Sequence, residues 1–203
     1  MSLLWLILST AWAAPPSIAP TPACPVSIGA LKLPEDIPAA RLQSKRLIVV
    51  LKGARRIFRV DSGKLLHTKE GPACWPIGLG FTPAGHKQVE GDGKTPEGLY
   101  ATSDKPWSQY YAAIAVHYPG IKDAVAAEGD SRIGPVIGRR IRRAIEAKKK
   151  PPQTTPIGGE ILIHGGGSAT DWTLGCIAME DAHIDQLRAT LPTDMVTEVL
   201  ILP

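Results

Sequence analysis

Glycine and proline limit the fold of this chain more than any other feature. Its 203 residues include 20 glycines and 19 prolines, which interrupt the apolar runs along its length. Both residue types weaken helices and favour turns. Short β-rich runs between such turns predict strands rather than a helical bundle. We therefore expect a mostly β domain with antiparallel pairing, and the length suits one domain around one hydrophobic core.

The predicted strands are short. The runs Leu47–Lys52 and Arg56–Val60 flank Gly53-Ala54, which predicts a hairpin. Residues 90–98 are dense in turn formers and predict a loop. Further strands are predicted at residues 64–68, 74–81, 99–103, 112–118, 160–163 and 195–201.

One segment has clear helical periodicity. Within Pro135–Lys149, the residues Ile137, Ile141 and Ile145 recur at i, i+4 and i+8, which predicts an amphipathic helix. The pair Pro151-Pro152 should end it.

Two other short helical segments and a basic patch complete the pattern. Residues 181–190 predict a short helix, and residues 123–129 predict a loop or a short helix. The net charge is only +4, and much of the positive charge lies in Arg139–Lys150. This patch suits an anionic surface or polymer, but a solvated helix face explains it equally well.

The N-terminus has the pattern of an export signal. Residues 1–14 are apolar and end in Ala11-Trp12-Ala13, which is similar to a signal cleavage site, and the run is too short to span a bilayer. A buried N-terminal segment is the alternative. Residues 15–45 predict a proline-rich arm, and residues 46–203 the folded domain. We expect an exported protein of the periplasm or cell envelope, with no transmembrane span after signal removal.

The chain contains three cysteines, Cys24, Cys74 and Cys176. In an oxidising compartment an odd number leaves one thiol over. Cys176 has a nearby histidine and a glycine-rich setting, so we expect Cys24 and Cys74 to form a disulfide between arm and domain. No two cysteines are close in sequence, so a C-x-x-C zinc or redox motif has no support.

The segment Ile161–Met179 combines residues that can perform chemistry. An apolar run ends in His164, the glycines 165–167 follow, and Gly175-Cys176 begins the next apolar stretch. A neutral imidazole can take the proton of a thiol, and the resulting thiolate is the attacking form. A buried structural thiol and a strand-end histidine are the alternative. We interpret the segment as a cysteine acyl-transfer site, which should show a reactive cysteine of low pKa.

Four segments together resemble a known family: LIVVLKGARRIFRV, EGDGKTPEGLYATSDK, VHYPGIKDA and IHGGGSATDWTLGCIAMEDAHIDQL. They are similar to the L,D-transpeptidase (YkuD) catalytic domain, and most to its YafK-like branch of murein L,D-transpeptidases and amidases. The resemblance implies a mostly β fold of the L,D-transpeptidase type, a β-sandwich with a few short helices and one basic helical insertion.

The resemblance also implies roles for individual residues. Cys176 would be the nucleophile, and His164 the general base and then the general acid. The carbonyl of Gly165 would orient the imidazole, and the N–H groups of Gly175 and Cys176 would form the oxyanion hole. Six further residues would bind substrate: Gly166, Gly167, Asp171, Trp172, Thr173 and Tyr118. The alternative role is packing within a loop for Asp171 and Trp172, and packing in the hydrophobic core for Tyr118.

The implied function is acyl transfer on peptidoglycan stem peptides, with no cofactor, no metal and no nucleic-acid partner. The acyl-enzyme would be resolved by diaminopimelate, by a lysine of an envelope protein or lipoprotein, or by water. The two amine acceptors correspond to transpeptidase activity, and water corresponds to L,D-carboxypeptidase or amidase activity. Leu174 replaces a histidine of the common family pattern, and Ala178 replaces an arginine or asparagine. These departures support the alternative, a non-catalytic peptidoglycan-binding module of the envelope.

Overall fold

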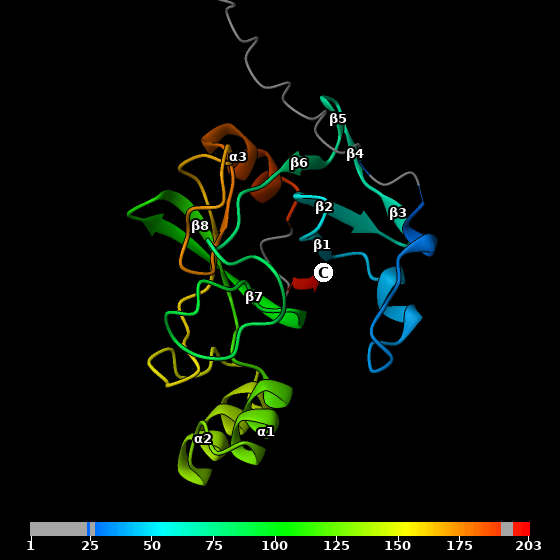
Figure 1. Ribbon diagram of the computed structural model, residues 1–203. Helices are drawn as coiled ribbons and strands as arrows, with labels where there is room; N and C mark the ends of the chain where they lie inside the picture. Colours follow the sequence, from blue (N-terminus) through cyan, green and yellow to red (C-terminus); the bar gives the residue numbers. More distant parts are fainter. Residues whose placement is uncertain (1–23, 25–26, 192–196) are drawn as a thin grey trace, which may run out of the picture.

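The computed structural model describes residue 24, residues 27–191 and residues 197–203 (Figure 1). The predicted export signal and residues 15–23 of the arm lie outside these residues. None of the helices in the described part of the chain has the length and apolar character needed to cross a membrane.

Most strands belong to one mixed sheet. The strands are β1 Leu47–Leu51, β2 Arg56–Asp61, β3 Lys64–Leu65, β4 His67–Thr68, β5 Gly71–Pro72, β6 Cys74–Pro76, β7 Gly98–Ser108, β8 Tyr111–Val116, β9 Leu162–His164, β10 Ile177–Ala178 and β11 Glu198–Leu202. Among the described residues the order is β10-β9-β8-β7-β11-β1-β2-β3, with β6 also paired to β2. Among the strand pairs of the described residues, only β1–β11 and β9–β10 are parallel, so the prediction of a mostly antiparallel β domain is confirmed.

The main core explains how the sheet is shaped. Side chains alternate between the two faces of a strand, so Ile48 and Val50 of β1 point to one side. They belong to the same buried cluster as Ile163 of β9 and Ile177 of β10, at the other end of the strand order. The sheet therefore curls until its two ends face each other across one core.

The opposite face of β1 is covered by the N-terminal arm. Leu47 and Val49 form a second buried cluster with Ile28, Ile37 and Leu42 of the arm. The expectation of a single core is therefore wrong, because β1 is apolar on both faces. The arm contains two short 3-10 helices, Ile28–Ala30 and Ala39–Gln43.

The predicted disulfide is present. Cys24 of the arm is bonded to Cys74 of β6, with 6.1 Å between their Cα atoms. Cys176 is the free cysteine of the described residues.

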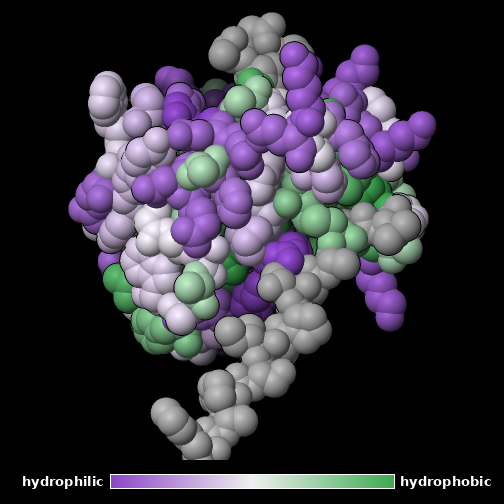
Figure 2. Space-filling model, turned by 90° about the horizontal axis from the view of Figure 1, so that it is seen from above, coloured by the Kyte–Doolittle hydropathy of each residue, from purple (hydrophilic) through white to green (hydrophobic). Residues whose placement is uncertain are grey.

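The part of the chain that the structure describes contains three α-helices: α1 Ile121–Gly129, α2 Pro135–Glu146 and α3 Asp181–Ala189. Helices α1 and α2 pack together at one end of the molecule (Figure 1) around a small cluster that includes Ala124, Ile141 and Ile157. The predicted isoleucine face of α2 is confirmed, since Ile137 and Ile145 pack against this cluster. Seen from above, where α3 lies, the surface is mostly hydrophilic with small hydrophobic patches (Figure 2).

Two predicted strands are broken. The strand predicted at residues 64–68 is divided into β3 and β4. The strand predicted at residues 74–81 ends at Pro76, which lacks the N–H that a continued ladder needs. Beyond it, Gly78 and Gly80 form isolated bridges to Ala178 and Thr173. These bridges bring the segment after β6 against the loop that precedes Cys176.

Candidate active site

His164 and Cys176 line the same cavity, which has a volume of about 770 Å³. The walls come from residues within 87–91, 105–110, 153–164 and 172–176. The cavity therefore collects four segments that lie far apart in the sequence.

The pairing of β9 with β10 places both side chains on one face. His164 lies opposite Ala178 in this parallel pair. The same register puts Cys176 beside Leu162, whose N–H donates to the Cys176 Sγ at 3.4 Å. Because side chains alternate along a strand, His164, Leu162, Cys176 and Ala178 share a face. The imidazole and the thiol thus lie on the same face, with Cys176 immediately before β10 and offset from His164 by two residues of register.

The His164 ring is buried and oriented by backbone. Its Nδ1 lies 2.5 Å from the carbonyl oxygen of Gly165, the contact that the family resemblance implies. Since the carbonyl only accepts, Nδ1 carries the proton and Nε2 keeps a free lone pair. Burial lowers the pKa of His164, partly opposed by the bond to Gly165. The imidazole is therefore neutral near pH 7 and can accept a proton.

Burial also raises the pKa of the Cys176 thiol, although the N–H of Leu162 acts in the opposite direction. The expectation of a low-pKa cysteine is therefore wrong for the resting site. The sulfur also donates weakly to the carbonyl of Glu160 at 3.5 Å, which fits a protonated thiol. The resting pair is a neutral thiol and a neutral imidazole, so ionisation has to accompany the attack on a substrate.

This resting state predicts how alkylation depends on pH. The rate at which iodoacetamide modifies Cys176 should be low at pH 7 and should still be rising above pH 9, the ordinary thiol pKa. The direction follows because only the thiolate reacts and a raised pKa moves its formation to higher pH. Intact-mass measurement without reductant reports Cys176 alone, since Cys24 and Cys74 are in the disulfide. A rate that levels off below pH 8 contradicts this assignment.

The turn before Cys176 is held by Thr173. The Thr173 hydroxyl accepts the N–H of Gly175 at 3.1 Å and donates to the carbonyl of Cys176 at 2.7 Å. The Gly175 N–H is therefore already bonded within the protein, so the structure adds no support for its predicted oxyanion role. The Cys176 N–H takes part in no hydrogen bond within the described part of the chain. One backbone donor is therefore available next to the sulfur.

Gly175 has a steric reason to be glycine. Its φ is +128°, and a Cβ there would lie 2.5 Å from the carbonyl oxygen of Lys94. The requirement is close packing against the loop at residues 90–98, rather than donation to a substrate.

Two aromatic side chains enclose the imidazole. Tyr110 stacks on His164, with ring centroids 4.6 Å apart and an interplanar angle of 27°. Trp172 contacts both rings edge-on, at 5.6 Å from His164 and 5.8 Å from Tyr110. Trp172 and Thr173 line the cavity as predicted for substrate-binding residues. Tyr110 was missed, because it lies in the turn between β7 and β8 and no sequence pattern relates it to His164.

Asp171 and Tyr118 do not face the cavity. Asp171 forms an ion pair with Arg55 at 2.6 Å and accepts the N–H of Leu79, so it holds two loops together. Tyr118 is fully buried, and its hydroxyl donates to the carbonyls of Ile157 and Lys87. These contacts favour the packing alternatives, and the structure adds no support for contact of either side chain with substrate.

The glycines after His164 form a bend behind the ring. The N–H of Gly166 donates to Asp181 Oδ1 at 2.8 Å, and that of Gly167 donates to the carbonyl of Met179. Both glycines have positive φ, +102° and +108°. Neither is among the cavity-lining residues, so the structure adds no support for their predicted contact with substrate.

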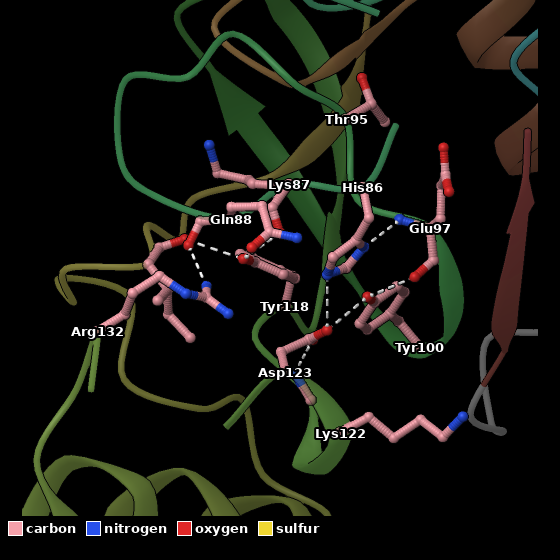
Figure 3. A network of polar contacts seen from close by, with 12 residues as sticks. His86, Lys87, Gln88, Thr95, Glu97, Tyr100, Tyr118, Lys122, Asp123 and Arg132 are labelled. Carbon is pink, nitrogen blue, oxygen red and sulfur yellow. Dashed lines mark hydrogen bonds and ion pairs between the residues drawn. The ribbon is translucent and has the colours of Figure 1, made fainter. Parts of the chain in front are cut away.

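A polar network fixes the loop that precedes β7 (Figure 3). His86 Nδ1 accepts the N–H of Glu97 at 2.9 Å, and its Nε2 lies 3.1 Å from Asp123 Oδ1. The hydroxyl of Tyr100 donates to Asp123 and to the carbonyl of Glu97. This network joins the loop to the start of α1, and the next residue, Lys87, lies in the cavity wall.

Asp92 closes the same loop on itself. Its carboxylate accepts the N–H groups of Gln88, Val89 and Lys94 and pairs with Lys87 at 2.9 Å. These donors lower the pKa of Asp92 to about 2, although burial opposes them. This loop, part of one of the segments that carry the family resemblance, therefore shapes a wall of the cavity. The described residues contain no cluster of three or more His, Cys, Asp and Glu that could hold a metal ion.

Comparison with known proteins gives a family match and a shared fold. Residues 45–201 match the sequence model of the YkuD family, the L,D-transpeptidase catalytic domain. No curated protein matches the chain.

Among solved structures, a mutant of the helical cell shape determining protein Pgp2 from Campylobacter jejuni is 24% identical, with a TM-score of 0.50 over 77% of this chain and 46% of that one. Bd1075 from Bdellovibrio bacteriovorus is 20% identical, with a TM-score of 0.45 over 87% of this chain and 53% of that one. An L,D-transpeptidase from Mycobacterium tuberculosis is 12% identical, with a TM-score of 0.40 over 78% of this chain and 58% of that one. The chain thus spans about half the length of the structures it resembles.

Proposed function

Because the chain belongs to the family of L,D-transpeptidase (YkuD) catalytic domains, we propose that it is a cysteine acyltransferase acting on peptidoglycan stem peptides. The observation that supports this most is a single cavity holding a thiol and an oriented, neutral imidazole. A purely structural pair would not need an open cavity over both groups.

The proposed first step is acylation of Cys176. The donor is the bond between an L-centre of the stem peptide, typically that of diaminopimelate, and a terminal D-residue. His164 Nε2 takes the thiol proton as the sulfur attacks the donor carbonyl, and the Cys176 N–H donates to the developing oxyanion. When the tetrahedral intermediate collapses, His164 returns the proton to the leaving amine. A free D-amino acid departs and a thioester remains.

The second step resolves the thioester. His164 takes a proton from the incoming amine or water, which attacks the thioester carbonyl, and the thiol is restored when the proton returns to sulfur. With a diaminopimelate amine the product is a cross-link. With water the product is a shortened stem peptide, and with a protein lysine it is an attached envelope protein.

The surroundings of the pair favour this chemistry. A neutral thiol and a neutral imidazole need no charge to be buried before substrate arrives, and the aromatic rings of Tyr110 and Trp172 exclude water from the base. The cavity also has charges of both signs at Lys105 and Glu160, 3.5 Å apart. Such a pair suits a stem peptide, which carries both carboxylates and an amine.

Incubation with a disaccharide tetrapeptide tests the proposal. We expect release of the terminal D-alanine and a transient gain in protein mass equal to the remaining acyl group, removed by hydroxylamine as a thioester is. Adding a diaminopimelate-containing acceptor distinguishes cross-linking from hydrolysis in the same assay. Binding of the muropeptide with neither D-alanine release nor a mass gain identifies the non-catalytic binding module instead.

A further inference from the structure

The helix α2 displays a basic face that the proposed chemistry does not use. Residues 139–150 contain seven of the chain's 23 lysines and arginines and one acidic residue, Glu146. The formal charge of this segment is therefore +6, more than the +4 of the whole chain. The rest of the protein is slightly acidic, so the positive charge is strongly localised.

Three arginines of this helix differ from the other arginines in their contacts. Arg139, Arg140 and Arg143 are exposed and form no ion pair and no side-chain hydrogen bond with any described residue. Six other arginines are bonded to carboxylates, hydroxyls or carbonyls, and one of them, Arg142 of α2, pairs with Glu128 at 2.6 Å. These bonded residues are Arg41, Arg55, Arg59, Arg132, Arg142 and Arg188.

The helix that carries the arginines is anchored. Ile141 lies between the arginines in sequence, is fully buried and packs α2 against α1. Arg139 and Arg143 are four residues apart and so occupy the same side of the helix. The three guanidinium groups therefore extend from one exposed side of α2. Planar guanidinium groups bind phosphate oxygens in pairs, better than an ammonium does.

An exposed apolar side chain accompanies the arginines. Val136 is 59% exposed and lies three and four residues before Arg139 and Arg140, on the same side of α2. On the neighbouring α1, Val125 is 56% exposed. A soluble polyanion offers no contact to valines, whereas a lipid surface offers phosphates and apolar chains together.

We propose that the face of α2 formed by Val136, Arg139, Arg140 and Arg143 docks the protein on an anionic phospholipid surface. The helix itself does not insert, because its apolar side is already packed on α1. The C-terminal end of α2 leads to Gln153 and Thr154 in the wall of the catalytic cavity, so docking fixes the orientation of that cavity relative to the membrane.

Vesicle co-sedimentation of the full chain tests the proposal. Wild type should pellet with vesicles of phosphatidylglycerol and phosphatidylcholine and stay soluble with pure phosphatidylcholine, with binding that weakens as salt rises. The variant Arg139→Gln/Arg140→Gln/Arg143→Gln should bind at least tenfold more weakly, because each basic residue at such a surface contributes roughly a factor of five. The matched control Lys45→Gln/Lys64→Gln/Lys69→Gln removes three exposed charges elsewhere and should bind like wild type.

Two further arms identify the partner. Val136→Ser should weaken binding to anionic vesicles and leave any binding to soluble polyphosphate unchanged. The proposal is overturned if the wild-type protein does not bind anionic vesicles at physiological salt. It is also overturned if the lysine control loses as much binding as the arginine variant. Polyphosphate binding as tight as vesicle binding, unaffected by Val136→Ser, would assign the face to a soluble polyanion instead. Circular dichroism and thermal melts of each variant show that the fold is kept, and none of these residues belongs to the catalytic pair.

Discussion

Replacing Cys176 with alanine is expected to abolish release of D-alanine from a tetrapeptide stem, a loss of at least about a thousandfold. The sulfur is the nucleophile of the proposed mechanism, and Cys176 lines the cavity beside Leu162 of β9. A buried structural thiol would behave differently, because alanine there would lower stability and leave turnover intact. Rates should be measured with purified protein and a disaccharide tetrapeptide, alongside the thermal midpoint of each variant.

The other two cysteines supply the control. The double variant Cys24→Ala/Cys74→Ala removes the disulfide, which lies outside the cavity lining. It should melt at a lower temperature, since the bond closes a loop of 50 residues, yet keep its activity at room temperature. His164→Ala should resemble Cys176→Ala, because both members of the pair act in one step. Turnover by Cys176→Ala at the wild-type rate removes the proposed mechanism altogether.

Replacing Gly80 with alanine is expected to lower the free energy of unfolding by about 3 kcal/mol, as inserting atoms into a closely packed interior does. A Cβ at this buried position would lie 2.0 Å from the carbonyl oxygen of Gly93 and 3.0 Å from the nitrogen of Gly175. Both atoms are backbone, so neither can rotate away. The loop at residues 90–98 and the turn before Cys176 would have to separate, and activity should fall together with stability.

Gly129→Ala is the matched substitution. Gly129 is the last residue of α1, has no neighbouring atom within 4 Å of an added Cβ, and is exposed. Alanine should leave stability unchanged or raise it slightly, because it favours helix more than glycine does. Urea denaturation of both variants makes the comparison. A Gly80→Ala midpoint equal to that of wild type contradicts the close crossing of the two loops.

The local pattern of the chain was sufficient for much of the fold. The hairpin of β1 and β2, the isoleucine face of α2 and the free thiol at Cys176 all follow from periodicity, turn residues and cysteine number. The Cys24–Cys74 pairing followed from the odd count. These features depend on residues near each other in sequence, or on the chemistry of a single residue type. They can therefore be predicted from the sequence.

Other features depend on which distant segments meet. Tyr110 stacks on His164 because β8 pairs with β9. Asp171 lies outside the cavity lining, where it forms an ion pair with Arg55 at 2.6 Å. Burial of the sulfur in the folded chain raises the pKa of Cys176. The residues next to Cys176 in the sequence do not indicate this burial. Sequence alone therefore predicted the fold and the candidate pair, His164 and Cys176. Burial and contact between remote segments decided the ionisation of this pair, its free backbone donor and its aromatic enclosure, because these properties arise only when the chain is folded.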